Sequence, residues 1–409
     1  MNTVLTAKPK GWLIGPFLDF IELKRGHDLP VQERIDGDNP IIGSNGITGY
    51  HNEAISSTEG VVTGRSGTLG KVYFTSNPYW PLNTSLYIND FKKNHPKYCY
   101  YFLKAFPLKS FGTGTGVPTL NRNIVHKQQV VFPPLYEQKK IATILSTVDK
   151  KMGLIEQSIT QTKQLKVGLM QKLFSKGVGI LKEDGNWQQH TEFKNSIFGQ
   201  IPSVWETPKL AECVTKVGSG VTPKGGSKAY LETGIPLLRS QNILFGKLKL
   251  DDVVFISDSQ HKKMKGSQLQ ARDVLLNITG ASIGRCAVLP CDFKEGNVNQ
   301  HVCIIRTTKN IIPEFTCIFL NSYLGQKQIW SLQAGGNREG LNFQQIRSFV
   351  IPVLPQNEQQ AIVDICFTVD SKLDLLEKQK AETQQLKKGL MQKLLTGEWR
   401  VPLDDNEPA

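Results

Sequence analysis

Two long stretches of the chain place apolar residues at alternating steps of three and four positions. The first lies within 133–176 and the second within 354–397. This heptad spacing puts the apolar side chains on one stripe of a helix and is typical of helices that supercoil around each other. It predicts two long helices with stripes formed by Ile141, Leu145, Val148, Met152, Ile155 and Ile159 and by Ile362, Cys366, Val369, Leu373 and Leu376.

These two helices are copies of one sequence. A shift of 221 residues lays 134–176 on 355–397 without a gap, and 21 of the 43 positions are identical. Each copy opens with a proline followed by a Glu-Gln pair, Glu137-Gln138 and Glu358-Gln359, and a carboxylate in the first turn suits a helix start. Gly177 and Gly397 are suited to end the two helices. One unit, a globular segment followed by a helix, has therefore been duplicated.

Two arrangements of the helices fit this pattern. Each helix could pack on its own globular segment, or the two copies could pair as an antiparallel coiled coil about a pseudo-twofold axis. The duplication favours the second arrangement, because identical stripes can cover each other. A helix of about 36 residues would be ~54 Å long and would set the distance between the globular segments.

The globular segments, 1–132 and 195–353, show short apolar runs between glycine-rich turns. Runs such as 60–63, 72–74 and 274–276 predict strands, and 89–108 and 313–333 predict one or two helices each. Residues 177–194 form a linker and 398–409 a tail. The expected fold is α+β: two similar domains with mixed sheets, separated by the two long antiparallel helices.

Charge is concentrated in the globular segments. The chain carries +13, of which +5 falls in 1–132 and +7 in 195–353. A basic balance indicates a polyanionic partner, and the absence of a basic tail indicates that folded surfaces bind it.

Several polar, glycine-rich loops recur in both segments. Arginine suits guanine edges, asparagine and glutamine suit adenine edges, and glycine lets the backbone approach phosphate. Any one of these loops could equally be an ordinary polar turn. The candidate DNA-binding residues are Ser44, Asn45, Arg65, Lys71, Thr113, Thr115, Arg239, Gln241, Asn242, Arg285, Asn299, Gln300, Asn337 and Arg338.

The seven cysteines include no CxxC pair, which favours buried, reduced thiols over a metal site. No apolar signal core opens the chain, and no run approaches the ~18 apolar residues of a membrane span. We expect no metal site, no membrane association and a cytoplasmic location.

The paired helix starts and the shared ending QLKxGLMQKL resemble the specificity subunit of type I restriction–modification systems. Segments 234–243, 280–285 and 297–301 are similar to that family's target-recognition domains. The resemblance covers nearly the whole chain. It implies a non-catalytic subunit with two target-recognition domains, each recognising half of a bipartite double-stranded DNA site.

The resemblance also implies partners. Two modification subunits would methylate adenine with S-adenosylmethionine, and usually two restriction subunits, which use ATP and Mg²⁺, would complete the complex. No cofactor is expected on this chain. The helices would set the gap between the half-sites and dock the modification subunits through polar outer faces.

Three alternatives stay open. A catalytic methyltransferase or nuclease would need an Asn/Asp-Pro-Pro-aromatic loop or a paired carboxylate motif, and Asn77-Pro78-Tyr79-Trp80 lacks the second proline. A purely structural coiled-coil adaptor would bind DNA without sequence preference. The recognition subunit of a type IIB system would look the same at the level of this chain.

Overall fold

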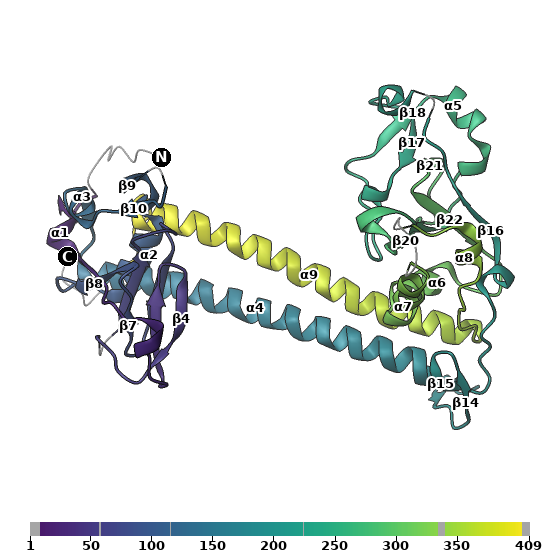
Figure 1. Cartoon of the computed structure of the whole chain (residues 1–409), viewed down its shortest axis with the longest axis horizontal. Coiled ribbons are helices and arrows are strands. Elements are labelled where there is room, and N and C mark those ends of the chain that lie inside the picture. Colours follow the sequence, from purple (N-terminus) through teal and green to yellow (C-terminus); the bar gives the residue numbers. More distant parts are fainter. Residues whose placement is uncertain (1–8, 57–58, 115, 224, 334–339, 403–409) are drawn as a thin grey trace. The chain divides into compact units, whose positions relative to one another are not determined.

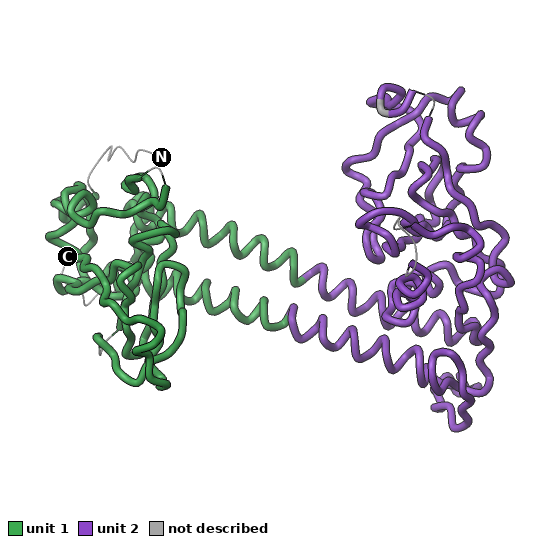
Figure 2. Tube along the Cα trace, in the orientation of Figure 1, with its two compact units in different colours: residues 1–158, 376–409 green, residues 159–375 purple. Residues whose placement is uncertain are grey.

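The computed structural model describes residues 9–56, 59–114, 116–223, 225–333 and 340–402. The chain divides into two compact units (Figure 2), each of which combines a globular segment with parts of both long helices. Unit 1 comprises Met1–Ser158 and Leu376–Ala409, and unit 2 comprises Ile159–Leu375. The compact units therefore cut across the long helices, whereas the sequence segments end where the helices begin.

Unit 1 contains a four-stranded sheet of order β2-β8-β5-β6 and a three-stranded sheet of order β4-β3-β7. Figure 1 labels β8 of the first sheet and β4 and β7 of the second. All neighbours are antiparallel except β3 and β7, so the smaller sheet is mixed. The elements of its globular part are β1 (Leu13–Pro16), α1 (Phe17–Phe20), β2 (Glu22–Arg25), β3 (Asn39–Gly43), β4 (Gly46–His51), β5 (Gly60–Gly64), β6 (Val72–Thr75), β7 (Trp80–Pro81), β8 (Ser85–Asp90), α2 (Pro96–Ala105), β9 (Gly112–Thr113), β10 (Thr119–Leu120), α3 (Arg122–His126) and β11 (Gln129–Phe132).

Unit 2 repeats this topology with sheets of order β16-β22-β19-β20 and β18-β17-β21, the β17–β21 pair being parallel. Two hairpins, β12–β13 and β14–β15, precede these sheets. The elements are β12 (Ile180–Leu181), β13 (Trp187–Gln188), β14 (Phe193–Ser196), β15 (Gly199–Pro202), β16 (Val214–Ser219), β17 (Ile235–Leu238), β18 (Val254–Ile256), α5 (Asp258–Lys263), β19 (Val274–Asn277), β20 (Cys286–Val288), β21 (Asn297–Val298), β22 (Val302–Thr307), α6 (Pro313–Asn321), α7 (Tyr323–Ser331) and α8 (Phe343–Arg347).

The strand registers make the two domains equivalent residue by residue. β7 and β8 correspond to β21 and β22 at an offset of 217, because 80–81 matches 297–298 and 85–90 matches 302–307. In the larger sheets, Thr63 pairs with Leu86 in unit 1 as Leu276 pairs with Cys303 in unit 2. The prediction of two similar α+β domains with mixed sheets is confirmed.

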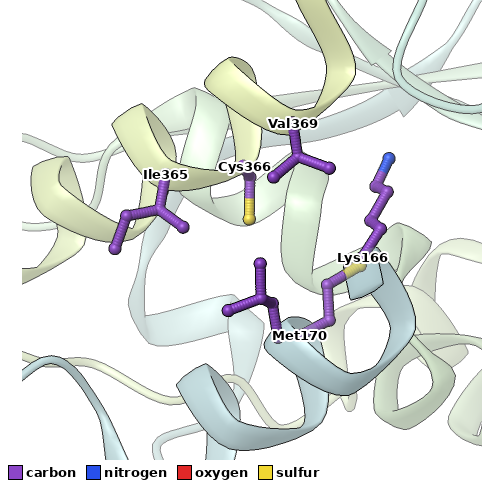
Figure 3. Close-up of a pocket in the computed structure, with 6 residues that line it drawn as sticks. Lys166, Met170, Ile365, Cys366 and Val369 are labelled. Carbon is purple, nitrogen blue, oxygen red and sulfur yellow. The ribbon is translucent and has the colours of Figure 1, made fainter. Parts of the chain in front are cut away.

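The long helices are α4 (Leu135–Lys176) and α9 (Gln356–Leu395). Within each unit they run antiparallel and carry the same ion pair: Lys387 with Asp149 in unit 1 and Lys166 with Asp370 in unit 2, each residue being the 221-offset copy of its counterpart. Figure 3 shows Ile365, Cys366 and Val369 of α9 facing Lys166 and Met170 of α4. All eleven predicted stripe residues are buried or half-buried. The ion pairs and the facing side chains confirm the predicted antiparallel pairing of the two helices.

The ends of both helices also belong to the domain cores. In unit 1, Ile141 and Leu145 at the start of α4 and Leu394 at the end of α9 pack with the sheet residues Leu23 and Val61. In unit 2, Leu173 and Phe174 of α4 and Ile362 of α9 lie in the equivalent core. Burying each such side chain contributes ~1.5–3 kcal/mol. The long helices therefore pack on the globular segments at their ends and pair with each other along their length. Both arrangements considered from the sequence are present.

Gly177 and Gly397 have φ of +70° and +73° just beyond the helices, as expected for helix ends. The predicted strands 60–63, 72–74 and 274–276 are present as β5, β6 and β19. The helix prediction for 89–108 was wrong in part, because Asn89 and Asp90 complete β8, the α-helix spans only Pro96–Ala105, and a short 3-10 helix begins at Leu108. Within the part of the chain that the structure describes, no helix is both long and apolar enough to cross a membrane.

Candidate nucleic-acid interface

In unit 1, four loops meet where β3 and β5 end and β8 begins. The Leu82 N–H donates to the Ile42 carbonyl at 2.9 Å, and the Arg65 N–H donates to the Thr84 carbonyl at 2.9 Å. The Arg65 carbonyl accepts from the Leu120 N–H at 2.7 Å, which adds the loop before α3. We define the loop cluster of unit 1 as the described residues of 43–46, 64–71, 82–84 and 112–120.

The same backbone bonds recur in unit 2. The Asn299 N–H donates to the Leu238 carbonyl at 3.1 Å, and the Ile278 N–H donates to the His301 carbonyl at 3.0 Å. The Ile278 carbonyl accepts from the Leu341 N–H at 2.9 Å. We define the loop cluster of unit 2 as residues 239–242, 278–285, 299–301 and 340–341. The duplication therefore reproduces the convergence of the loops as well as the sheets.

A glycine directly after β2 and another directly after β16 allow this convergence. A Cβ atom on Gly26 would lie 2.2 Å from the Leu82 carbonyl oxygen, and one on Gly220 would lie 1.5 Å from the Val298 carbonyl oxygen. Any side chain at these positions would push the loop before β8 or β22 away. The repeat found in the sequence does not align these two glycines, because they lie 194 residues apart whereas the helices repeat at 221.

The structure places most candidate residues of unit 1 together in its loop cluster. The Ser44 N–H donates to Thr84 Oγ1 at 3.4 Å, so Ser44 and Arg65 both contact Thr84. The Arg65 guanidinium donates to the Asn83 carbonyl at 3.4 Å. Asn45, Lys71 and Thr113 are exposed. Thr115, and Asn337 and Arg338 of unit 2, lie outside the described residues.

In unit 2, the loop after β17 uses several candidate side chains for its own structure. Asn242 is fully buried, and its side chain donates to the carbonyls of Lys249 and Asp252 at 2.9 and 3.0 Å. The Asp252 carboxylate also accepts from the Gln241 amide and lies 3.7 Å from Arg239. The structure therefore places Asn242 beneath the surface, while Arg239 and Gln241 are held by an acidic neighbour.

The remaining candidates of unit 2 lie at the crossing of its loops. Arg285 is half-buried and directly precedes β20, the position that Lys71 holds before β6. The Asn299 side chain is 8% exposed and accepts from the His301 N–H at 3.1 Å. Gln300 is exposed.

Two side-chain contacts in these clusters involve residues that the sequence analysis did not select. Asp28 accepts a hydrogen bond from the Asn83 amide in unit 1, and Thr222 donates to the Gln300 amide in unit 2. The two amides belong to Asn83 and Gln300, which precede β8 and β22 by two residues. Their partners follow strands far away in the sequence, and no local motif indicates them.

The duplicated glutamines after the helix starts connect each helix to its domain. Gln138 Oε1 accepts from the His95 N–H at 2.8 Å, and Gln359 Oε1 accepts from the Ile312 N–H at 2.8 Å. Both donors are the N-cap residues of equivalent helices, α2 and α6. Each glutamine is buried and also donates to a backbone carbonyl just before its helix, that of Pro133 in the first copy and that of Leu354 in the second. These residues tie the start of each long helix to the start of α2 or α6 in its domain.

The duplicated glutamates are buried as well. In unit 2, Glu358 accepts from the Trp205 indole and from the His190 ring, both at 2.9 Å. In unit 1, Glu137 accepts from the Trp12 indole at 3.1 Å and pairs with Arg400 of the tail. Both carboxylates lie in the first turn of their helix, as the sequence predicts for a helix start. They also bind the segments that enter and leave each domain.

Four leucines on the long helices are exposed and recur as copies. Leu154 and Leu375 occupy equivalent positions and are 64% and 56% exposed. Leu165 and Leu386 are likewise equivalent and are 54% and 53% exposed. Each unit thus presents one leucine of each pair, so the outer faces are less polar than expected.

The buried thiols of the chain are poor candidates for catalysis. Six of the seven cysteines are buried, and Cys291 is exposed, contrary to expectation. Burial raises the pKa of Cys303 to about 12 and that of Cys366 to about 11, so both thiols stay protonated at neutral pH. Among the described residues, no group of three or more His, Cys, Asp or Glu side chains is placed to hold a metal ion.

The chain is similar to known proteins over most of its length. A family model described as the type I restriction modification DNA specificity domain matches residues 9–164 and 202–385. Each match covers one globular segment and most of the helix that follows it. The type I restriction enzyme MjaVIII specificity subunit of Methanocaldococcus jannaschii is 31% identical over 310 residues, which cover 74% of this chain and 70% of that protein. The EcoBI specificity subunit of Escherichia coli is 25% identical over 334 residues, which cover 76% and 68%.

Solved structures share the fold. The S subunit of a type I restriction–modification system from M. genitalium has a TM-score of 0.63 at 19% identity, covering 95% of this chain and 99% of that chain. A second structure, from work on complex assembly and conformational transition of the type I R-M system, has a TM-score of 0.57 at 14% identity and covers 96% and 100%.

Proposed function

Because the chain belongs to the type I restriction–modification DNA specificity family, we propose that it is the DNA-recognition subunit of such a complex, without catalytic activity of its own. Each domain recognises half of a bipartite site on double-stranded DNA in the cytoplasm. The observation that carries this proposal is the duplication: two basic domains with one topology, one strand register and one set of converging loops. Two equivalent recognition surfaces suit a target with two parts.

The loop clusters are the proposed recognition surfaces. They hold glycines, amides and guanidinium groups, which suit close backbone approach to phosphate and hydrogen bonding to base edges. Their domains carry most of the positive charge of the chain, and charge of this kind supplies the salt-dependent part of DNA binding. Arg65, Lys71 and Arg285 lie in these clusters.

The long helices set the gap between the half-sites and dock two modification subunits. The buried Glu-Gln pairs support the first role, because they fix each helix to its domain and so make helix length a determinant of domain spacing. The repeated exposed leucines support the second role, since each unit offers an equivalent apolar contact to a partner. S-adenosylmethionine, ATP and Mg²⁺ would bind to the modification and restriction subunits.

Methylome sequencing of host DNA with and without this chain tests the proposal. We expect a two-part motif with a methylated adenine in each half that disappears when the chain is deleted. Exchange of residues 195–350 for the corresponding domain of a relative should change one half-site only, and a helical turn added to both helices should widen the gap only. A change in both half-sites after the domain exchange would refute the assignment of one domain to each half.

A further inference from the structure

One amide side chain occupies the same position in both domains. Asn83 lies two residues before β8 and Gln300 lies two residues before β22, and the strand register makes the two positions equivalent. Each amide is hydrogen-bonded to a residue that follows the neighbouring edge strand by three positions. The partner of Asn83 is Asp28, after β2, and the partner of Gln300 is Thr222, after β16. The duplication has thus kept an amide and a polar partner for it, although all four residue types at these positions differ.

In unit 2 the amide is held from both sides. Thr222 Oγ1 donates to Gln300 Oε1 at 2.5 Å, and Gln300 Nε2 donates to His301 Nε2 at 2.9 Å. An amide nitrogen can only donate, so His301 Nε2 accepts and the ring proton is on Nδ1, which donates to Thr279 Oγ1 at 2.6 Å. The Gln300 amide is therefore held by Thr222 on one side and, on the other, by His301, which Thr279 holds in turn.

This arrangement leaves the amide able to bind a ligand. Oε1 has two lone pairs and Nε2 has two N–H groups, and each atom uses one of them within the chain. One acceptor and one donor remain, and the Gln300 side chain is exposed. An amide that offers a donor and an acceptor together matches N7 and the N6 amino group of adenine in the major groove.

In unit 1 a shorter amide is held by a carboxylate. Asn83 Nδ2 donates to Asp28 Oδ1, and the Asp28 carboxylate lies 3.5 Å from the Arg25 guanidinium. The Asn83 backbone carbonyl accepts from the Arg65 side chain at 3.4 Å, which ties the amide to the centre of the loop cluster. Asn83 Oδ1 accepts no hydrogen bond from the described residues, so a donor and an acceptor are again open.

We propose that Gln300 and Asn83 each recognise one adenine, in the half-site of their own domain, and that Thr222 and Asp28 are positioning residues for them. This inference rests on the proposed function. The physical reason is preorganisation: an amide already fixed by its neighbours discriminates adenine from other bases without first losing its rotational freedom.

The test uses the assembled modification complex and measures methylation of duplexes in which each base pair of the half-sites is replaced in turn. Gln300→Ala should lower discrimination at a single adenine position about 5- to 150-fold, the range expected for one bidentate contact, and should leave the other half-site unchanged. Gln300→Glu, which keeps the acceptor and loses the donor, should shift preference at that position towards cytosine. Gln270→Ala is the matched control, because Gln270 is an exposed glutamine before the start of β19, at the opposite end of that strand from the loop cluster.

Positioning is tested separately. Thr222→Val should reduce discrimination at the same base, whereas Thr222→Ser, which keeps the hydroxyl, should restore it. A destabilised domain would instead lower methylation of every substrate by a similar factor.

Every result of these experiments either supports the inference about Gln300 or overturns it. A uniform loss over all positions, unchanged discrimination, or relaxation at a base other than adenine in Gln300→Ala would overturn the inference. If the unaltered complex itself shows no sequence preference, the proposed function fails first. If that complex recognises a bipartite motif and Gln300→Ala keeps it in full, only this inference fails.

Discussion

Glu358 offers a sharp test of how the long helices are joined to the domains. Its Oε1 accepts from the N–H groups of Val178 and Gly179 at 2.9 and 3.0 Å and from His190 at 2.9 Å. Its Oε2 accepts from the Trp205 indole at 2.9 Å, and the side chain is 1% exposed. One carboxylate thus collects four donors from three separate segments of unit 2.

The substitution Glu358→Gln keeps the shape and removes the charge. In the better orientation the amide oxygen faces the three donors on the Oε1 side, and the amide nitrogen faces the Trp205 N–H. Hydrogen bonds to a charged group contribute ~1.5–3 kcal/mol and neutral ones ~0.5–1.5 kcal/mol, while an unsatisfied buried donor costs ~1–3 kcal/mol. Relief of the cost of burying a charge offsets part of this loss. We expect a net loss of ~3 kcal/mol in the free energy of unfolding of unit 2.

For a unit of this size, such a loss lowers Tm by ~6–12 °C. Urea and thermal unfolding of the full chain would measure it, with Glu232→Gln as the control, because Glu232 is an exposed glutamate of the same unit. Hydrogen exchange adds a local measurement: the amide protons of Val178 and Gly179 should exchange faster in Glu358→Gln. The reasoning is refuted if Glu358→Gln matches the control in both stability and the exchange of these two amides.

Two further changes test the interface and the docking surface. In urea unfolding, Gly220→Ala should lower the free energy of unfolding by ~3 kcal/mol or more, because its Cβ would overlap the Val298 carbonyl. Gly266→Ala is the control: open space surrounds Gly266, so the change should be ~0.5 kcal/mol or less. Leu154→Ser combined with Leu386→Ser should reduce the modification subunits that copurify with the chain from two to one, as measured by native mass spectrometry; retention of both subunits would contradict the docking role of these leucines.

The helices were predictable because their information is local and repeated. Heptad spacing fixes which side of a helix is apolar, and the gapless offset of 221 carried that pattern into a second copy. The strands were predicted less completely because their equivalence follows the pairing register. Their offsets of 217 and 213 differ from the 221 of the helices. Loops between strands tolerate insertions and deletions, whereas the pairing within the sheets is kept.

The site was predictable by segment and less so by residue. Residue type alone selected Asn242 for DNA, but the loop after β17 needs that amide for its own carbonyls. Gln300 was selected by the same reasoning, yet its partner Thr222 is 78 residues away and no local pattern connects them. The role of the Glu-Gln pairs was hidden for the same reason: the partner of Gln138 is at His95, 43 residues earlier.

The composition of unit 1 has a consequence for synthesis on the ribosome. Unit 2 is continuous, but unit 1 needs residues 376–409 to complete it, and the Glu137 carboxylate of α4 pairs with Arg400. At ~5–20 residues per second, roughly 10–50 s pass between the emergence of the unit 1 part of α4 and that of Arg400. During this interval the core of unit 1 lacks Leu394 and Leu395 of α9, and Glu137 lacks its partner Arg400. Translation therefore completes unit 2 before unit 1, and a chain cut short between residues 375 and 400 would contain every segment of unit 2 but not of unit 1.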